Sequence, residues 1–526
     1  MLPLSPWNPI RSRWHVRPSA AVWLVLSLAA LVPLAGCDGD ADGYQAGAAS
    51  RVDPRVADCD DLDPTVHPGA VDDEVDGIDR DCDGVDGPAA DSWGGWTGMD
   101  LGATGFFRVE ETADRWWLVT PEGHPFFSTG VNHVTFDGDY EPSTGTSPYH
   151  DANVARYGSR AAWAEEVGRR YDAWGFNTLG AWSESFAGSG RAYTVILDIA
   201  GGNWSGPIPD YFAPDFAARA ASIAAASVAS RVSDPDLLGY FLDNEMRWGP
   251  SYQRVTFLLD DYLGYDSTAP GKLALVDFLR ARYGNDVAAL DAAWGGSFAS
   301  FDEVLAATTL GPAVYPPTVE QMDARQAFLE LAARRYYEIA TGAVRAADPN
   351  HLILGERVVG QLVYPEVMRA SASLVDVVSV NRYQHDPVWA LAISLLDNLV
   401  TGRELFLPDG DDFAAIHAVT GRPILQSEFG YRAADSGLPN TWPPMMLVVP
   451  DQKARADWFE QDVTPSIASD YVVGYHWFEH VDEPHGGRFD GEDSNWGMVD
   501  EHDDPYATLV TRMSEVNRWW RLPPHS

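Results

Sequence analysis

The sequence predicts an α/β fold: a (β/α)8 barrel of the TIM type, preceded by a small acidic module. From Trp93 onward, short apolar runs alternate with amphipathic, Ala- and Arg-rich stretches such as 216–232 and 321–347. The apolar runs number eight, which is the count that a closed barrel needs. No Gly-rich phosphate loop follows any of them, which disfavours a doubly wound open sheet. We therefore expect the barrel domain over residues 91–526.

Each expected strand ends in polar or aromatic residues, as it would if all carboxyl ends opened on one cleft. The strands are expected at 121–133, 176–182, 193–199, 237–244, 352–356, 375–381, 423–428 and 472–478. A hairpin-like stretch, 106–119, precedes the first of them. Between the fourth and fifth, residues 249–318 are too long for a simple connection. This insertion, with a helix at 272–282, is expected to form a lid or a wall of the cleft.

Composition limits the partners of the chain. Among 526 residues, 36 basic side chains stand against 77 acidic ones, which gives a formal net charge of −41. Such a charge repels nucleic acid and anionic lipid head groups, so no nucleic-acid partner is expected. Aromatic residues make up 12% of the chain, including 20 Trp. These flat side chains are either ordinary core residues or surfaces on which sugar rings stack.

The amino-terminal 37 residues are typical of an export signal. Three arginines between residues 11 and 17 precede an apolar run at 20–34, which is too short for a stable transmembrane span. The run ends in Leu34-Ala-Gly-Cys37, which resembles the bacterial lipobox, so Cys37 is the expected site of lipidation. A plain signal peptide is the alternative. We expect an exported lipoprotein at the periplasm or cell surface, with residues 38–52 as a flexible tether and the lipid as its only membrane contact.

Residues 53–90 form the acidic module, in which two Asp-rich clusters each contain one cysteine. The alternating carboxylates that end at Asp83 and are followed by Gly84 have the spacing with which one tight loop wraps a calcium ion. The expected ligands are Asp58, Asp60, Asp63, Asp76, Asp79, Asp81 and Asp83. Cys59 and Cys82 are expected to form a disulfide that adds about 3 kcal/mol to stability. The segment resembles short Asp/Cys metal-binding repeats of bacterial surface proteins; a disordered acidic linker is the alternative.

Two expected strands end in a carboxylate. The fourth ends in Asn244 and Glu245, and the seventh ends in Glu428. One glutamate at a strand end is commonly a salt-bridged rim residue, but two of them on one barrel favour glycoside hydrolysis. In that chemistry one carboxyl group acts as acid and base and the other as nucleophile, and no cofactor is needed for catalysis.

The Asn-Glu and Glu strand ends together resemble clan A of the glycoside hydrolases, which are retaining enzymes on eight-fold barrels. Residues 116–132 and 474–500 are similar to the β-agarases of glycoside hydrolase family 50. Residues 278–295, within the insertion, also resemble the family 42 β-galactosidases. The chain departs from family 50 in two ways. The acidic module replaces a larger β-rich domain, and Glu492-Asp493 stands where the family usually has Glu-Asn.

This resemblance implies roles for individual residues. Glu245 would be the general acid/base, Glu428 the nucleophile and Tyr383 a hydrogen-bond donor to the nucleophile. The two carboxyl groups would lie about 5 to 5.5 Å apart, and the charge of Glu428 would raise the pKa of Glu245. Trp477 would form the floor of the subsite that holds the bond to be cleaved. The expected substrate-binding residues are Asn132, Trp182, Asn244, Arg357, Tyr383, His476, Trp477 and Arg488.

The expected substrate is a β-galactan such as agarose or its oligosaccharides. Two alternatives remain: a retaining hydrolase of another β-glycan, such as a β-galactoside, mannan or glucan, and a surface glycan-binding protein without catalysis. The presence of both Glu245 and Glu428 favours an enzyme. Arg357 and Arg488 could each orient carboxylates or contact sugar.

Overall fold

The computed structural model describes residues 90–520, apart from 114, 185–189, 202–207, 251–255, 361–363, 402–411 and 519, together with short pieces between residues 45 and 82. The chain divides into two compact units, Met1–Pro68 and Gly69–Ser526. In the first unit, β1 (Gln45–Ala46) and β2 (Ala57–Asp58) pair in parallel. In the second, Cys82 is disulfide-bonded. The predictions made for Cys37, Cys59, Asp60, Asp76, Asp81 and Asp83 lie outside the described residues.

A parallel sheet with the strand order β10-β9-β8-β7-β6-β16-β13-β12-β11 organises the second unit. Its strands are β6 (Ser128–Val131), β7 (Thr178–Leu179), β8 (Ala192–Ile196), β9 (Leu237–Phe241), β10 (Leu352–Ile353), β11 (Arg357–Val359), β12 (Val378–Asn381), β13 (Ile424–Phe429) and β16 (Val472–Trp477). All eight strand positions expected from the sequence are occupied by these strands, because β10 and β11 belong to one short stretch of chain, 352–359.

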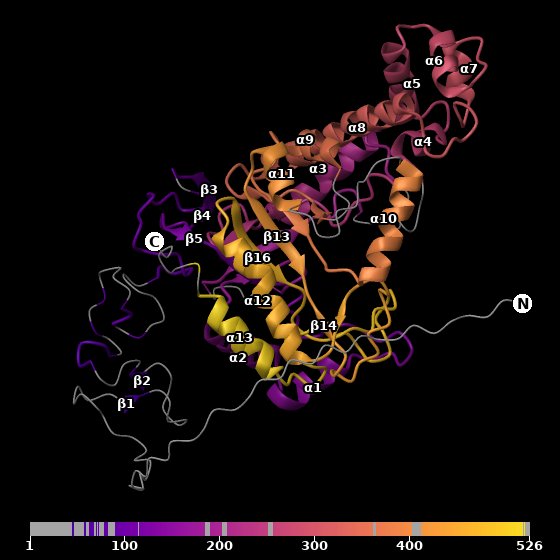
Figure 1. Ribbon diagram of the computed structural model, residues 1–526. Coiled ribbons are helices and arrows are strands. Elements are labelled where there is room, and N and C mark those ends of the chain that lie inside the picture. Colours follow the sequence, from indigo (N-terminus) through magenta and orange to yellow (C-terminus); the bar gives the residue numbers. More distant parts are fainter. Residues whose placement is uncertain are drawn as a thin grey trace, which may run out of the picture. The chain divides into compact units, whose positions relative to one another are not determined.

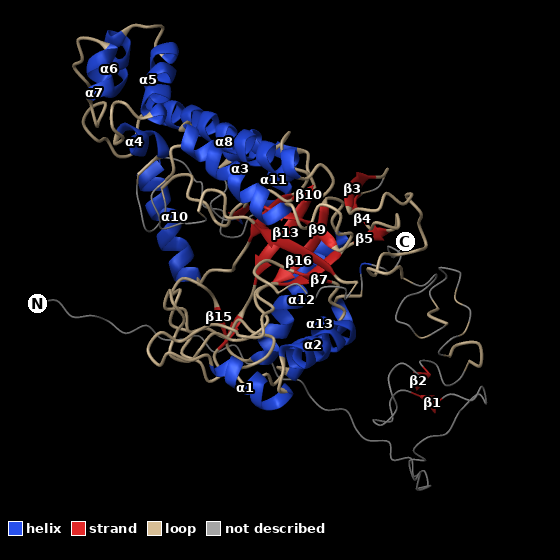
Figure 2. Ribbon diagram, turned by 180° about the vertical axis from the view of Figure 1, so that it is seen from behind, coloured by secondary structure: helices blue, strands red, loops and turns tan. Residues whose placement is uncertain are grey.

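That stretch joins the two edges of the sheet. On one side Leu352 pairs with Gly239 of β9, and on the other Arg357 pairs with Ser379 of β12. Backbone hydrogen bonds from Leu354 to β9 and from Val377 to Ile353 connect it further. The sheet therefore curls until its ends meet in residues 352–359. This is a TIM-like barrel, with the strands in the centre and the helices around them (Figure 2).

Helices follow the strands as expected, with one exception. They are α1 (Pro148–Tyr157), α2 (Arg160–Trp174), α3 (Pro214–Val228), α9 (Pro365–Ser371), α10 (Pro387–Thr401), α11 (Asp412–Thr420), α12 (Gln452–Ala468) and α13 (Ala507–Val516). Between β7 and β8 no described residue is helical. Local sequence fixes the helix ends. In α2, the Ser159 side chain accepts a hydrogen bond from the Ala162 N–H, and Gly175 in the left-handed conformation ends the helix.

The insertion folds into four short helices that precede the long helix α8 (Val319–Ala347). They are α4 (Leu258–Leu263), α5 (Pro270–Arg282), α6 (Val287–Trp294) and α7 (Phe301–Ala306). The helix expected at 272–282 is thus confirmed as α5. In both views α5, α6 and α7 stand beyond the sheet at one end of α8 (Figures 1 and 2). The expected lid is therefore not formed by these three helices, because α8 carries them away from the strands.

A small antiparallel sheet closes the amino-terminal end of the barrel. It consists of β3 (Arg108–Glu111), β4 (Trp116–Val119) and β5 (Pro125–Phe126), and it confirms the hairpin expected at 106–119. Leu118 and Phe126 from this sheet share one buried cluster with barrel residues, including Leu354 and Leu425. This packing leaves the carboxyl ends of the strands for chemistry. None of the helices in the described part of the chain has the length and apolar character of a membrane span.

The barrel interior is packed tightly enough to test by mutation. A Cβ atom added to Gly130 of β6 would lie 2.3 Å from Cδ2 of the buried His476 ring. We expect Gly130→Ala to lower the free energy of unfolding by about 1–3 kcal/mol, measured by guanidinium denaturation. Gly342→Ala is the control. Nothing lies within 4 Å of this position in α8, so that variant should be about 0.5–1 kcal/mol more stable. Equal stabilities of the two variants would contradict the packing argument.

Candidate active site

Backbone strain gathers at the carboxyl ends of four neighbouring strands. The strands β6, β7, β8 and β9 are followed by His133, Trp182, Asp198 and Glu245, whose φ angles are 54°, 59°, 52° and 48°. Non-glycine residues rarely adopt this left-handed conformation, which costs of order 1–3 kcal/mol per residue and is most often kept at functional sites. The strain therefore places the candidate site at this end of the barrel, as the sequence predicted.

Asn381, the last residue of β12, connects the two predicted catalytic carboxylates. Its Nδ2 donates hydrogen bonds to Glu245 Oε1 at 3.0 Å and to Glu428 Oε2 at 3.1 Å. The Ser427 hydroxyl donates to Asn381 Oδ1 at 2.8 Å and so fixes which way the amide faces. The two carboxylate oxygens cannot be farther apart than the sum of those two distances. That limit on the two nearest oxygens admits the roughly 5–5.5 Å separation of the carboxyl groups in retaining glycosidases.

Arg357 and Tyr383 hold Glu428. Arg357 Nη2 lies 2.8 Å from Glu428 Oε2, and the Tyr383 hydroxyl donates to Oε1 at 2.6 Å. The hydrogen bond expected from Tyr383 is thus present. Burial raises the pKa of the Glu428 carboxyl group, while the Arg357 charge and the Tyr383 hydrogen bond act against that rise. Both contacts favour the ionised form that a nucleophile needs.

Glu245 has the environment of a general acid. Burial raises the pKa of its carboxyl group to about 7, the neighbouring charge of Glu428 adds to the rise, and the Asn381 hydrogen bond opposes it. The rise agrees in direction with the sequence expectation, but burial rather than Glu428 is the larger cause. A carboxylic acid with a pKa near neutrality can be protonated before bond cleavage and can act as a base afterwards.

Two more of the predicted residues lie beside this pair. Asn244 Oδ1 accepts hydrogen bonds from Arg357 Nη1 at 3.1 Å and from Asn381 Nδ2 at 3.2 Å. The Arg357 guanidinium also stands 4.5 Å from the centroid of the Trp182 ring, which is 37% exposed. The structure therefore brings together Asn244, Arg357, Tyr383 and Trp182 around the carboxylates.

Asn132 was expected to bind substrate, but its side chain is occupied by the protein. Its Nδ2 donates to the backbone carbonyls of Ser427 at 3.0 Å and Trp477 at 3.2 Å. Its Oδ1 accepts from the Ala181 N–H at 2.9 Å and from Arg357 at 3.2 Å. The residue is fully buried. Asn132 therefore connects the ends of several strands by hydrogen bonds, and its side chain is not accessible to a sugar.

Trp477 and His476 also lie elsewhere than predicted. Side chains of a strand alternate between its faces, and Trp477 points outward to the helix layer. Its ring packs against Phe429 and against Phe459 of α12, and its Nε1 donates to the Trp496 carbonyl. His476 points inward, where Nε2 lies 2.9 Å from the Ser128 hydroxyl. Both side chains are fully buried, so neither forms a sugar subsite.

The aromatic rings at the mouth of the barrel are different ones. Phe478 and Trp496 form a buried cluster with Tyr383. The Tyr383 and Trp496 ring centroids are 5.3 Å apart, and Phe478 lies 6.4 Å from Trp182. Both residues lie within the stretch 474–500 that resembles family 50, and the sequence predicted no role for either of them. Strand alternation could have identified Phe478, because it follows the outward-facing Trp477.

Arg488 orients carboxylates, which was one of the two roles left open for it. Each of its three side-chain nitrogens lies within 4 Å of at least one carboxylate oxygen, and only 13% of the side chain is exposed. The partners are Asp139, Glu479, Glu483, Asp490 and Glu492. The prediction that Arg488 binds substrate is therefore not supported, because its donors are already engaged.

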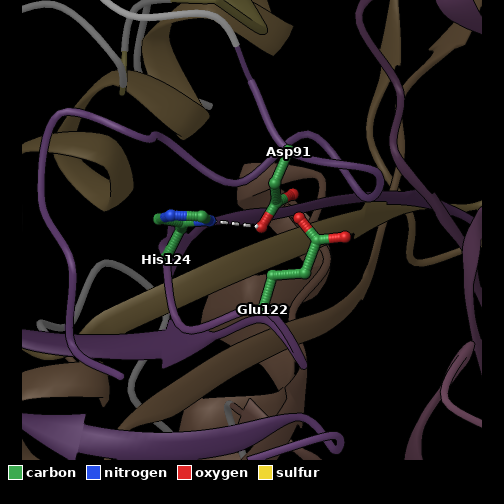
Figure 3. A group of neighbouring side chains, drawn as sticks. All are labelled: Asp91, Glu122 and His124. Carbon is green, nitrogen blue, oxygen red and sulfur yellow. Dashed lines mark hydrogen bonds and ion pairs between the residues drawn. The ribbon is translucent and has the colours of Figure 1, made fainter. Parts of the chain in front are cut away.

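Two groups of side chains in the described part of the chain have the spacing of metal ligands. His133, Asp139 and Glu479 form the first, but the cation of Arg488 already lies beside both carboxylates. Asp91, Glu122 and His124 form the second (Figure 3). There His124 Nδ1 is 2.9 Å from Asp91, whose carboxylate also accepts the N–H groups of Trp93 and Gly95. Both groups are thus accounted for by contacts within the protein.

The contacts of Asn381 predict a change in pH dependence. Asn381→Ala removes the hydrogen bond that opposes the rise in the pKa of Glu245. We expect the alkaline limb of the pH profile of kcat/KM for glycoside hydrolysis to move to higher pH. The maximum of kcat/KM should fall about 10²-fold, because Asn381 no longer holds the two carboxylates in position. Ser427→Ala keeps the amide and should shift the limb less. A limb that stays in place or moves to lower pH would contradict this role for Asn381.

The comparisons with known proteins agree with this geometry. No protein-family model matches the chain. β-agarase A of Vibrio sp. (strain JT0107) is 30% identical in an alignment 478 residues long, and the match covers 78% of this chain and 45% of that protein. β-agarase B of the same strain is 26% identical in an alignment 509 residues long, and the match covers 82% and 50% of the two chains. The chain thus spans about half the length of the curated relatives it matches.

Solved structures give the same result for the fold. An exo-β-agarase is 25% identical with a TM-score of 0.69, covering 83% of this chain and 68% of that one. The protein PfGH50B is also 25% identical, with a TM-score of 0.68 and coverage of 82% and 69%. In sequence and in fold, the barrel of this chain is therefore similar to the agarases of glycoside hydrolase family 50.

Proposed function

We propose that the protein is a retaining glycoside hydrolase that cleaves β-galactosidic bonds of agarose-like polysaccharides or oligosaccharides. The observation that carries the proposal is the short bridge through Asn381 between Glu245 and Glu428. Its close spacing favours a nucleophile over a water-filled gap. The agarases similar to this chain support the choice of substrate.

In this proposal Glu428 attacks the anomeric carbon while Glu245 gives its proton to the leaving oxygen. Arg357 and Tyr383 keep the nucleophile ionised until it bonds to carbon. Glu245, now a carboxylate, then takes a proton from water, and the resulting hydroxide displaces Glu428 from the sugar. Two inversions at one carbon leave its configuration unchanged, and each carboxyl group regains its first protonation state.

Asn244 has a part in substrate binding in this scheme. Its Oδ1 is taken by Arg357 and Asn381, so its Nδ2 is the group that it offers to the sugar 2-hydroxyl. Hydrogen bonds to that hydroxyl strengthen in the transition state of glycosidases. The same geometry would serve another β-glycan, because loop contacts that select a sugar are worth only about 1–3 kcal/mol each. Hydrolysis of agarose, porphyran, galactan, mannan and aryl β-galactoside by the full chain, read as reducing ends and product lengths, decides the substrate.

The two catalytic roles make opposite predictions for chemical rescue. With Glu428→Ala, azide attacks from the vacated face and yields the inverted glycosyl azide. With Glu245→Ala, an activated substrate still forms the covalent intermediate, and azide yields the retained product. Both variants should lose at least about 10²-fold in activity on an unactivated substrate.

Glu184→Ala is the matched control, since this glutamate also follows a barrel strand but is bound to Arg160 and to the Phe136 N–H at the rim. It should keep near-normal activity. Rescue products with exchanged stereochemistry would keep the site and swap the roles of Glu245 and Glu428. Normal activity in either alanine variant would overturn the proposal.

We also propose that Cys37 carries a lipid anchor and that residues 53–90 bind calcium. Support comes from the lipobox-like sequence, from the Asp spacing and from the disulfide state of Cys82. Because the barrel has its own core, EGTA with a reductant should remove a small calorimetric transition of the full chain and leave hydrolysis intact. Loss of hydrolysis on EGTA treatment would contradict this independence. Incorporation of labelled fatty acid that Cys37→Ser abolishes would support the anchor.

A further inference from the structure

Large aromatic side chains are exposed on loops at the carboxyl end of the barrel. Phe489 is 79% exposed, Tyr140 57%, Trp442 39% and Trp182 37%. They follow four different strands: Tyr140 comes after β6, Trp182 after β7, Trp442 after β13 and Phe489 after β16. Single exposed apolar residues need no explanation, but several exposed aromatic rings on loops that follow neighbouring barrel strands are typical of a binding surface.

Phe489 is connected to Glu428 through a series of side-chain contacts. The Arg488 guanidinium lies 5.7 Å from the centroid of the Phe478 ring and 5.6 Å from that of Phe489. Phe478 in turn lies 6.4 Å from Tyr383, which binds Glu428. The Arg488 guanidinium therefore contacts both Phe489 and the aromatic cluster at the mouth of the barrel.

The loops that carry these rings are held to one another. Asp139, next to Tyr140, lies 3.5 Å from Arg488. On the other side of Phe489, Asp493 accepts the N–H groups of Thr441 at 2.7 Å and Trp442 at 3.1 Å. An exposed ring on a braced loop loses little conformational freedom when a ligand stacks on it, which is what a binding platform requires.

We propose that Phe489 is a platform on which a further sugar unit of a neutral glycan chain stacks, outside the subsite of the bond that is cleaved. The proposal rests on the function proposed above and adds a binding site for the extended chain. A pyranose ring has an apolar face of C–H groups that suits an aromatic ring. The carboxylates of Asp490 and Glu492, on the same loop, can accept hydrogen bonds from its hydroxyls.

A neutral chain fits this surface better than a sulfated one. Arg488 lies over the Phe489 ring, and its three side-chain nitrogens are engaged by five carboxylates. A sulfate group next to Phe489 would therefore meet these carboxylates and no uncommitted Arg488 donor. Uncharged hydroxyl groups are not repelled by these carboxylates.

Binding without turnover tests the platform. In a Glu428→Gln background, neoagaro-oligosaccharides of four, six and eight sugar units are titrated by calorimetry. Phe489→Ala should weaken binding of the chains that reach the platform by about 5- to 30-fold, as expected for loss of an aromatic anchor. Phe489→Tyr should bind like the parent, because it restores the ring. Tyr315→Ala is the matched control: this aromatic side chain is 58% exposed in the insertion, between α7 and α8, and its loss should change nothing.

Kinetics of the otherwise unchanged enzyme give a second readout. Phe489→Ala should raise KM on agarose by the same factor and leave kcat, the pH profile and the hydrolysis of the shortest cleaved oligosaccharide unchanged. Equal affinity of Phe489→Ala and the parent for every chain length would overturn the platform while leaving the proposed function in place. If the parent neither binds nor cleaves any galactan, the proposed function itself fails, and the platform as proposed fails with it.

Discussion

The ion pair between Arg357 and Glu428 is the contact on which the barrel end and the active site both depend. Arg357 lies in the stretch 352–359 that joins the two edges of the sheet, and its side chain is fully buried. The same guanidinium donates to Asn244 after β9, to Asn132 after β6 and to the Ser427 carbonyl of β13. Closure of the sheet thus places a cation beside Glu428, and loss of either partner of such a buried pair typically costs about 3–5 kcal/mol.

This arrangement explains how two carboxyl groups in contact with one amide acquire different properties. Glu428 faces Arg357 and the Tyr383 hydroxyl, both of which favour its charged form. The largest influences on the pKa of Glu245 are burial and the charge of Glu428, and both favour the protonated form. In the proposed mechanism, the division between nucleophile and acid follows from which side of Asn381 the cation occupies.

Much of this could be predicted from sequence because it depends on local pattern. Apolar runs located all eight strands, and strand ends located Glu245, Glu428 and Tyr383. The errors had two physical causes. Trp477 was misplaced because strand alternation, which turns it outward to α12, was not applied. Asn132 was misassigned because its partners, such as the Ser427 carbonyl, come from distant segments, and no local pattern reports such pairs. No role was predicted for Asn381 for the same reason. Arg488 differs, because four of its five carboxylate partners lie within nine residues of it in the sequence, so the ion-pair role, one of the two left open, could have been favoured.

The loop after β16 carries a second charged cluster, which lies outside the barrel around Arg488. Inside the barrel, the buried Arg357 is paired with the carboxylate of Glu428, and four residues in the left-handed conformation follow the neighbouring strands β6 to β9. Outside it, Arg488 is surrounded by five carboxylates and stacks on Phe478 and Phe489. The outer cluster has more negative than positive charge, so it offers acceptors for hydroxyl groups and repels anions. Charge would then select neutral sugars before they reach the carboxylates that act on them.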